Sequence, residues 1–220
     1  MNADCCQIDR LPLGVMRTNT YIVRPIGETV AWVFDPGMGD MTEVLDRVAR
    51  DELAVERILL THGHGDHIAG IGQLKRAWPE AIITAPAGDA HMLTDAQANL
   101  SAPFGMAVTA LEAEELIEPG QILTLGETRW QVLDTSGHTP GGVSYLCRQT
   151  RVVIVGDALF AGSIGRCDIP EANLGRLVAN IRKNLMSLDD EIEVLCGHGP
   201  PTRIGVERSS NPYLPTARRS

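Results

Sequence analysis

The chain has 220 residues and a formal net charge of −9, which comes from 28 acidic and 19 basic side chains. Hydrophobic residues make up 44% and charged residues 21%, a globular composition that excludes a disordered, collagenous or coiled-coil chain. The acidic balance opposes general binding to nucleic acid or to anionic membranes, so we expect neither as a partner. Composition leaves the oligomeric state open.

Short apolar runs bounded by glycine, proline or aspartate are interspersed with segments of helical spacing, and this pattern predicts a loop-rich α/β fold. The expected strands, in chain order, are Thr20–Val23, Val30–Phe34, Ile58–Leu60, Ile82–Thr84, Trp130–Leu133, Ser144–Cys147, Val152–Val155 and Glu193–Cys196. The expected helices are Met41–Arg50, Ile68–Trp78, Ala87–Leu93 and Leu174–Leu188, the last with Asn173 as its N-cap.

The stretch from residue 94 to residue 118 is the least regular. Within it, 95–105 predicts an irregular surface loop, and the segment that begins at 112 predicts an acidic turn or a short helix. No repeat or linker divides the sequence. We therefore expect a single domain over residues 1–220, with a frayed tail at 214–220.

The N-terminal sequence and the cysteines bear on the cellular compartment. Acidic residues stand where a secretion signal needs a basic segment, and no apolar stretch reaches the length of a membrane span. The five cysteines are an odd number without the spacing of a disulfide framework, so we expect reduced thiols. Together these features predict a cytoplasmic protein.

The side chains that carry chemistry follow the ends of predicted strands. Directly after Ile58–Leu60, six residues contain His62, His64, Asp66 and His67, with glycines that allow tight turns between them. Imidazoles and a carboxylate at this density predict a metal site, and these ligand types suit zinc or iron.

Three further candidate ligands follow later strands in glycine-containing turns: His138, Asp157 and His198. Because ligands collect at the carboxyl ends of strands in α/β layers, we expect these three to join the first four. His91 stands apart from this pattern on a predicted helix, so we expect it to have a surface or packing role.

Seven ligands form two sets of four if one is shared, and Asp157 is the candidate bridge because a carboxylate has two oxygens. We expect it to join His62, His64 and His138 on one metal, and Asp66, His67 and His198 on the other. Such sites keep room for a water whose pKa the metals lower, which predicts a catalytic centre with a hydroxide nucleophile. Zinc is the default metal, and the same ligands accept iron or manganese.

From Thr18 to Leu214 the chain resembles the metallo-β-lactamase superfamily, and the resemblance rests on the ordered motif His62-x-His64-x-Asp66-His67, His138, Asp157 and His198. It implies a four-layer αββα sandwich of two mixed β-sheets with outer helices and with the metals at one edge. The bridging aspartate and the segment 156–166 are similar to the glyoxalase II branch, the hydroxyacylglutathione hydrolases. The segment after the last histidine ligand is similar to short bacterial members of that branch.

Four residues are candidates for roles beside the metals. Arg166 occupies the position of a basic residue in the glyoxalase II branch, so we expect it to bind a substrate carboxylate; Asp168 stands where that branch has a tyrosine, and pairing with Arg166 is the alternative. Asp35 ends a strand near the expected centre and is a candidate to orient a histidine ligand. Asp66 is the candidate proton shuttle.

The ligand set and the resemblance together indicate a binuclear metal-dependent hydrolase of a small-molecule thioester such as a hydroxyacylglutathione. A hydroxide that bridges the metals would attack the thioester carbonyl. The short segment after His198 lacks the helical extension that holds glutathione in that branch, so the resemblance implies thioester hydrolysis more directly than glutathione recognition. The alternatives are a mononuclear iron persulfide dioxygenase, to which Gly165–Asp168 is also similar, a β-lactamase, and a non-catalytic metal-binding protein.

Overall fold

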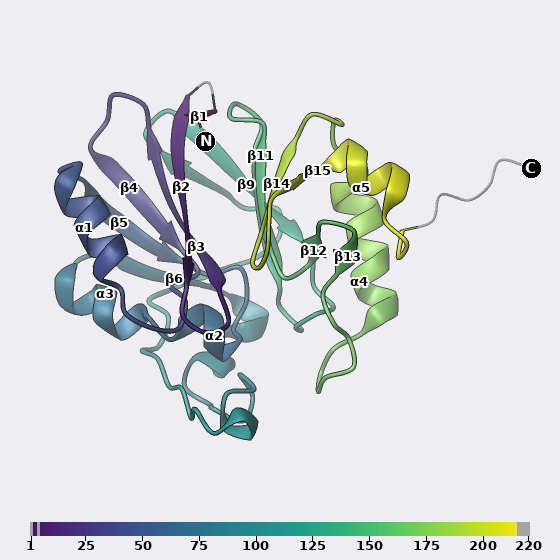
Figure 1. Ribbon diagram of the computed structural model, residues 1–220, viewed down its shortest axis with the longest axis horizontal. Helices are drawn as coiled ribbons and strands as arrows, with labels where there is room; N and C mark the ends of the chain where they lie inside the picture. Colours follow the sequence, from purple (N-terminus) through teal and green to yellow (C-terminus); the bar gives the residue numbers. More distant parts are fainter. Residues whose placement is uncertain (1, 4, 215–220) are drawn as a thin grey trace, which may run out of the picture.

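The computed structural model describes residues 2, 3 and 5–214 as two facing β-sheets with helices on their outer sides (Figure 1). Among these residues, one sheet holds seven strands in chain order: β1 (Asn2–Ala3), β2 (Cys6–Leu13), β3 (Thr18–Pro25), β4 (Val30–Phe34), β5 (Ala54–Leu59), β6 (Ile82–Pro86) and β7 (Glu115–Ile117). Strands β1 to β4 pair antiparallel and β4 to β7 pair parallel, so this sheet is mixed.

The second sheet contains six strands in the same part of the chain. Their spatial order is β15 (Thr202–Arg203), β14 (Glu193–Cys196), β11 (Val152–Gly156), β10 (Val143–Cys147), β9 (Thr128–Asp134) and β8 (Ile122–Leu125). Only β11 and β14 pair in parallel, so this sheet is also mixed. A small hairpin of β12 (Leu159–Phe160) and β13 (Ser163–Ile164) follows β11.

Strand direction brings the functional loops to one edge of the sandwich. In the first sheet β4 and β5 are parallel. In the second sheet β9, β11 and β14 share a direction, because β10 is antiparallel to both β9 and β11 and β14 is parallel to β11. The carboxyl ends of strands that share a direction lie at the same edge of their sheet. The loops that carry the candidate ligands leave from these ends.

Helices cover the outer face of each sheet (Figure 1). The first sheet packs against α1 (Thr42–Arg50) and α3 (Ile71–Ala77), and the second against α4 (Leu174–Asn180), its π-helical continuation η3 (Ile181–Leu185) and α5 (Ile204–Ser210). The remaining helical segments are α2 (Gly65–Ile68), η1 (Ala87–Leu93) and η2 (Ala102–Phe104). This is the four-layer αββα arrangement, so the expected fold class is confirmed.

The core between the sheets contains a cluster of aromatic side chains among aliphatic ones. Along β4 alternate side chains point to opposite faces, so Trp32 and Phe34 enter the space between the sheets while their neighbours pack under the helices. The Phe34 ring lies 5.1 Å from that of Tyr145, and Trp32 lies 6.3 Å from Trp130. These contacts hold the two sheets, and hence the loops at their edge, in one relative position.

Most expected elements are present, and two expectations were wrong. All eight expected strands form, most with longer bounds, but the structure contains further strands that were not expected: β1, β2, β8, β12, β13 and β15. The segment expected as an acidic turn or short helix contains β7, because Ile117 is buried and the backbone pairs with β6. The helix expected over Ile68–Trp78 is interrupted, since the Gly70 amide donates to the Pro36 carbonyl at 3.0 Å instead of continuing the helix.

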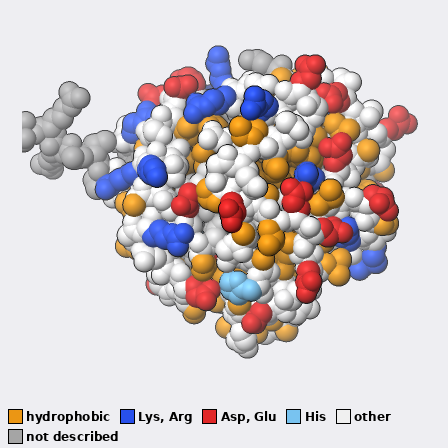
Figure 2. Space-filling model, turned by 180° about the vertical axis from the view of Figure 1, so that it is seen from behind, with side chains coloured by type: hydrophobic (Ala, Val, Ile, Leu, Met, Phe, Trp, Pro, Cys, Tyr) orange, Lys and Arg blue, Asp and Glu red, His pale blue; other side chains and the backbone are white. Residues whose placement is uncertain are grey.

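At the C-terminal end, Asn173 caps α4 as expected by accepting from the Arg176 amide. Leu214, where the frayed tail was expected to begin, packs in the core of the second outer layer, and residues 215–220 lie outside the described residues. None of the helices in the described ranges has the length and apolar character needed to span a bilayer. On the rear face of the molecule, acidic and basic side chains are scattered among apolar ones (Figure 2).

Candidate metal centre

The structure brings all seven predicted ligands together. They lie in loops after β5, β9, β11 and β14, at the edge of the sandwich to which these strands point: His62, His64, Asp66, His67, His138, Asp157 and His198. In each of two groups, one nitrogen or oxygen of every member lies within 4.8 Å of the others: His62 with His64 and His138, and Asp66 with His67 and His198. With Asp157 set aside, these two groups match the two predicted sets, and a third group, His62 with His67 and Asp157, takes one histidine from each set.

Asp157 lies between the two groups. Its Oδ2 is 3.6 Å from His138 Nε2 in the first group and 3.5 Å from His198 Nε2 in the second. Its Oδ1 is 3.4 Å from His67 Nε2. A carboxylate within reach of both groups is the arrangement that a ligand shared by two cations requires.

Several buried polar atoms at this centre have no hydrogen-bond partner within the described chain. They are Nε2 of His62, His67 and His138, Oδ1 of Asp157, and Nδ1 of His67, which faces Asp35. An unpaired buried polar group costs about 1–3 kcal/mol, so the four of these atoms that face the centre call for a common partner. Imidazole nitrogen and carboxylate oxygen are donors that divalent zinc and iron accept, and these residues therefore fit metal ions.

The charge distribution also favours cations. His67 is fully buried and lies near the carboxylates of Asp66, Asp157 and Asp35. Burial opposes a proton on this imidazole, yet the three carboxylates raise its pKa above the ordinary value. For His64, by contrast, burial lowers the pKa to about 3, which leaves the neutral imidazole that binds metals. A metal ion can take the place of the proton that the carboxylates attract to His67.

Backbone carbonyls hold the outward ring nitrogens of two histidines. His138 Nδ1 donates to the Arg166 carbonyl at 2.9 Å, and His198 Nδ1 donates to the Met16 carbonyl at 3.1 Å. Because a carbonyl only accepts, the proton of the neutral imidazole lies on Nδ1. Nε2 then turns its lone pair toward the centre, as a metal ligand must.

Asp35 reaches a candidate ligand from behind, as the sequence predicted. It ends β4 in the left-handed conformation, with φ of 47°, and its Oδ2 lies 3.1 Å from His67 Nδ1. Its carboxylate also accepts from the amide and the hydroxyl of Thr61. Since that hydroxyl donates to Asp35, it accepts from Nδ1 of His62 at 3.0 Å. One carboxylate thus orients two imidazoles.

Asp66 is held as an ionised carboxylate. Thr18 Oγ1 donates to its Oδ2 at 3.0 Å, and His198 Nε2 lies 3.2 Å from the same oxygen. Burial opposes ionisation, but His67, His198 and the Thr18 hydroxyl hold the pKa of Asp66 below its ordinary value. Thr18 was absent from the predicted site, since its contact depends on the hairpin of β2 and β3.

Asp89 is a second residue that the sequence did not identify. It is fully buried in η1 and accepts from the Gly63 amide at 3.1 Å, the Thr139 hydroxyl at 2.7 Å and the Gly141 amide at 2.6 Å. Gly63 lies between two candidate ligands of the first sheet, and Thr139 follows His138 of the second. Asp89 therefore fixes the distance between the two loops that form the first group.

Glycines permit the close approach of these loops. A Cβ on Gly88 would lie 2.7 Å from Gly141 Cα, so the backbone of η1 contacts that of the His138 loop directly. A Cβ on Gly197 would lie 2.1 Å from Asp157 Oδ1. Larger side chains at these positions would push the ligand loops apart.

The remaining predicted residues lie at the periphery. The Arg166 guanidinium forms a bidentate ion pair with the Asp168 carboxylate, in which Nε and Nη2 donate to Oδ1 and Oδ2 at 2.9 and 3.0 Å. Both side chains are exposed. The structure therefore contains the ion pair between Arg166 and Asp168 that was named as the alternative. His91 is exposed, 3.8 Å from Glu171, which confirms its expected surface position.

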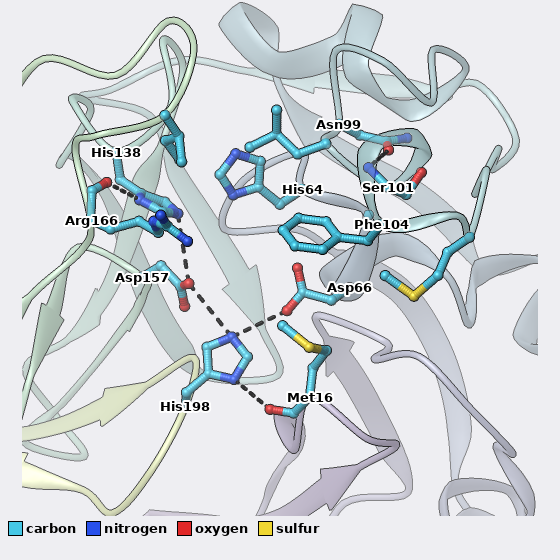
Figure 3. Close-up of a pocket in the computed structure, with 14 residues that line it drawn as sticks. Met16, His64, Asp66, Asn99, Ser101, Phe104, His138, Asp157, Arg166 and His198 are labelled. Carbon is cyan, nitrogen blue, oxygen red and sulfur yellow. Dashed lines mark hydrogen bonds and ion pairs between the residues drawn. The ribbon is translucent and has the colours of Figure 1, made fainter.

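A pocket of about 130 Å³ opens onto the centre (Figure 3). Its floor contains ligands from both groups: His64, Asp66, His138, Asp157 and His198. Arg166 lies on one side, and Phe104 and Met16 lie on the other (Figure 3). A small molecule in this pocket would contact the centre directly.

A two-sheet α/β sandwich with paired histidine–aspartate groups at one edge defines a class of metal-dependent enzymes. The family described as the Metallo-beta-lactamase superfamily matches residues 13–198, and the chain belongs to this superfamily.

Two relatives match over nearly their whole length. The chain is 35% identical to the "Probable metallo-hydrolase YqgX" of Bacillus subtilis over 93% of this chain and 96% of the relative. It is 32% identical to the "Hydroxyacylglutathione hydrolase GloC" of Haemophilus influenzae over 94% and 97% of the two chains.

Solved structures agree with this assignment. BLEG-1, described as a B3 metallo-beta-lactamase, has a TM-score of 0.90 and 34% identity, with 94% of this chain and 99% of that chain covered. TTHA1623, in a di-iron-bound form, has a TM-score of 0.81 and 32% identity over 94% and 100% of the two chains. Together with the histidine–aspartate cluster, the comparisons support a metal-dependent hydrolase.

Replacing Asp157 with Ala should remove at least one metal ion per chain, because its carboxylate lies within reach of both groups. The metal content of the purified variant, measured by elemental analysis, checks this. Asp168→Ala is the matched control, since that aspartate is exposed and should leave metal content unchanged. Unchanged metal content in Asp157→Ala would contradict the bridging position.

Asp89→Asn should weaken metal binding at one of the two sites about 10- to 100-fold, because the outer contacts that orient ligands have effects of that size. Titration of the metal-free protein with Co²⁺, followed by its absorption spectrum, separates the two binding events. Glu207→Gln is the control: Glu207 is equally buried and accepts similar hydrogen bonds, but it holds neither loop of the first group. An equal loss at both sites would show that Asp89 only stabilises the fold.

Proposed function

We propose that the protein is a binuclear metal-dependent hydrolase that cleaves thioesters of the hydroxyacylglutathione type. The observation that carries this proposal is the position of Asp157, whose oxygens lie 3.4–3.6 Å from ligand atoms of both groups. With Asp157 shared, His62, His64 and His138 would hold one ion, and Asp66, His67 and His198 would hold the other. Zinc is the default metal, and the di-iron form of TTHA1623 supports iron as the alternative.

When bound, two such ions supply a water of lowered pKa and a Lewis acid for the substrate carbonyl. The chain supplies the geometry. Asp35, Thr61 and two backbone carbonyls orient the imidazoles, and Asp89 sets the separation of the loops. The pocket admits a substrate on the side of the centre that faces solvent.

Hydrolysis forms a bond between the water oxygen and the carbonyl carbon and breaks the bond from that carbon to sulfur. The electron pair of the broken bond leaves with the sulfur as a thiolate. A thiol has a pKa of about 8.5, so departure does not require prior protonation. The proton lost by the water needs an acceptor, and Asp66 is the candidate because its carboxylate lines the pocket.

Arg166 supplies a cation for a substrate carboxylate. It lines the pocket opposite Phe104, and its fork with Asp168 uses Nε and Nη2, so a substrate carboxylate would approach from the Nη1 side. The likeness to GloC over nearly the full length of both chains supports a glutathione thioester as the substrate to test first.

The proposal is tested on protein purified without added metal. We expect two metal ions per chain and release of thiol from S-lactoylglutathione. One tightly bound iron with oxygen uptake on glutathione persulfide would replace the proposal with a persulfide dioxygenase. Efficient turnover of a chromogenic lactam would identify a β-lactamase, and bound metal without turnover of any of these substrates would indicate a non-catalytic metal-binding protein.

Arg166→Met should raise the Michaelis constant for S-lactoylglutathione about 2- to 5-fold while metal content stays the same. The effect is modest because the Arg166 side chain is 60% exposed and screened by solvent. Asp168→Asn should lower the Michaelis constant, since it removes the competing carboxylate. Arg203→Met is the control, because Arg203 is also 60% exposed and ion-paired but does not line the pocket. Equal effects of the two arginine variants would contradict the assigned role.

A further inference from the structure

Exposed apolar side chains gather at the mouth of the pocket. Phe104 is 67% exposed, Met16 48% and Met106 36%, and all three line the pocket together with Leu100 and Ile169. Large apolar side chains clustered in water beside a polar centre mark a binding surface for apolar groups. We call Met16, Phe104 and Met106 the apolar wall.

Two members of the apolar wall, Phe104 and Met106, lie on a loop that hydrogen bonds hold in place. The Asn99 side chain donates to the carbonyls of Met92 and Val108, and the Ser101 hydroxyl accepts from the Val108 amide. The Asn99 carbonyl accepts from the amide of Gly65, the first residue of α2. These bonds anchor the segment that carries Phe104 to the loop of the candidate ligands, and the Phe104 side chain lines the pocket (Figure 3).

The second part of the wall is tied to the centre as well. Met16 belongs to the turn between β2 and β3, and its carbonyl accepts from Nδ1 of His198. Its side chain is left to line the pocket on the same side as Phe104 (Figure 3). Arg166 lies on the opposite side, with Asp66, Asp157 and His198 in between.

Because Arg166 and the apolar wall lie on opposite sides of the centre, each can bind a different half of a thioester. The acyl chain and the sulfur leave a thioester carbonyl in different directions. When the carbonyl is placed at the centre and a carboxylate of the thiol half at Arg166, the acyl chain points to the apolar wall. We propose that the apolar wall is an acyl-binding subsite and that the protein prefers thioesters with unbranched apolar acyl chains over the short, polar lactoyl group. This inference rests on the proposed thioester hydrolysis.

The expected size of the effect follows from burial of apolar surface. Each methylene that passes from water to an apolar surface should strengthen binding about 3- to 4-fold, until the chain extends past the wall. The glutathione half is the same in every member of a series, so only the acyl subsite contributes to the trend.

Two measurements test the subsite. The first is kcat/KM for acetyl-, butanoyl- and hexanoylglutathione. The second is calorimetric binding of S-methyl-, S-butyl- and S-hexylglutathione to the metal-loaded protein, which requires no turnover because these compounds are thioethers. Both should rise with chain length in the unaltered protein and in Phe104→Leu, and the rise should flatten in Phe104→Ser. Leu111→Ser is the matched control, because Leu111 is an exposed leucine outside the pocket, and it should keep the full trend.

The outcomes separate this inference from the proposed function. Turnover of lactoylglutathione without any dependence on chain length would overturn the subsite and leave thioester hydrolysis standing. No turnover of any thioester, with a chain-length trend in binding that is lost in Phe104→Ser, would overturn the hydrolase and keep an apolar subsite. If Phe104→Ser converts a dimer into monomers and leaves both trends unchanged, the wall is an interface between copies and the subsite is wrong.

Discussion

The structure depends on the burial of carboxylates among imidazoles at one edge of the sandwich. Asp35, Asp66 and Asp157 all lie within 3.1–3.6 Å of a nitrogen of His67, which is fully buried. Negative charge removed from water is costly unless positive charge or hydrogen-bond donors compensate it. The chain supplies hydrogen bonds to most of the outward atoms, whereas the inward Nε2 atoms of His62, His67 and His138 have no partner among the described residues and are left to be satisfied by cations. The need for metal is therefore a property of the folded chain.

The candidate ligands come from both sheets and have to meet at one point. The directions of the strands and the packing contacts between the sheets bring them there. Parallel strand directions within each sheet place the ligand loops at one edge, and the aromatic core fixes one sheet against the other. The final adjustment is made by backbone contact at Gly88 and Gly141 and by the buried carboxylate of Asp89, which hydrogen-bonds to loops of both sheets.

The pocket combines a tightly held floor with a rim of different chemistry. Backbone carbonyls orient two of the floor ligands from behind, Arg166 holding His138 and Met16 holding His198. The rim is asymmetric: an exposed arginine faces exposed apolar side chains across the centre. Met16 belongs to both parts, because its carbonyl holds His198 while its side chain lines the rim. Recognition can therefore change by substitution at the rim while the floor keeps its geometry.

The sequence by itself identified the seven candidate ligands, because histidines packed this densely at a strand end are rarely there for packing alone and the remaining ligands repeat that position. It also predicted the contact of Asp35 with a histidine. It did not reveal Asp89, whose three donors come from residues 26 to 52 positions away, nor β7, which exists only because β6 offers a parallel edge. Whether Arg166 stands alone or pairs with Asp168 was likewise decided by the folded backbone. Residue type and spacing along the chain are enough to identify candidate ligands, because both can be read locally in the sequence. The distances between loops and the neighbours of a side chain are set by long-range packing, which no local pattern of a single sequence encodes.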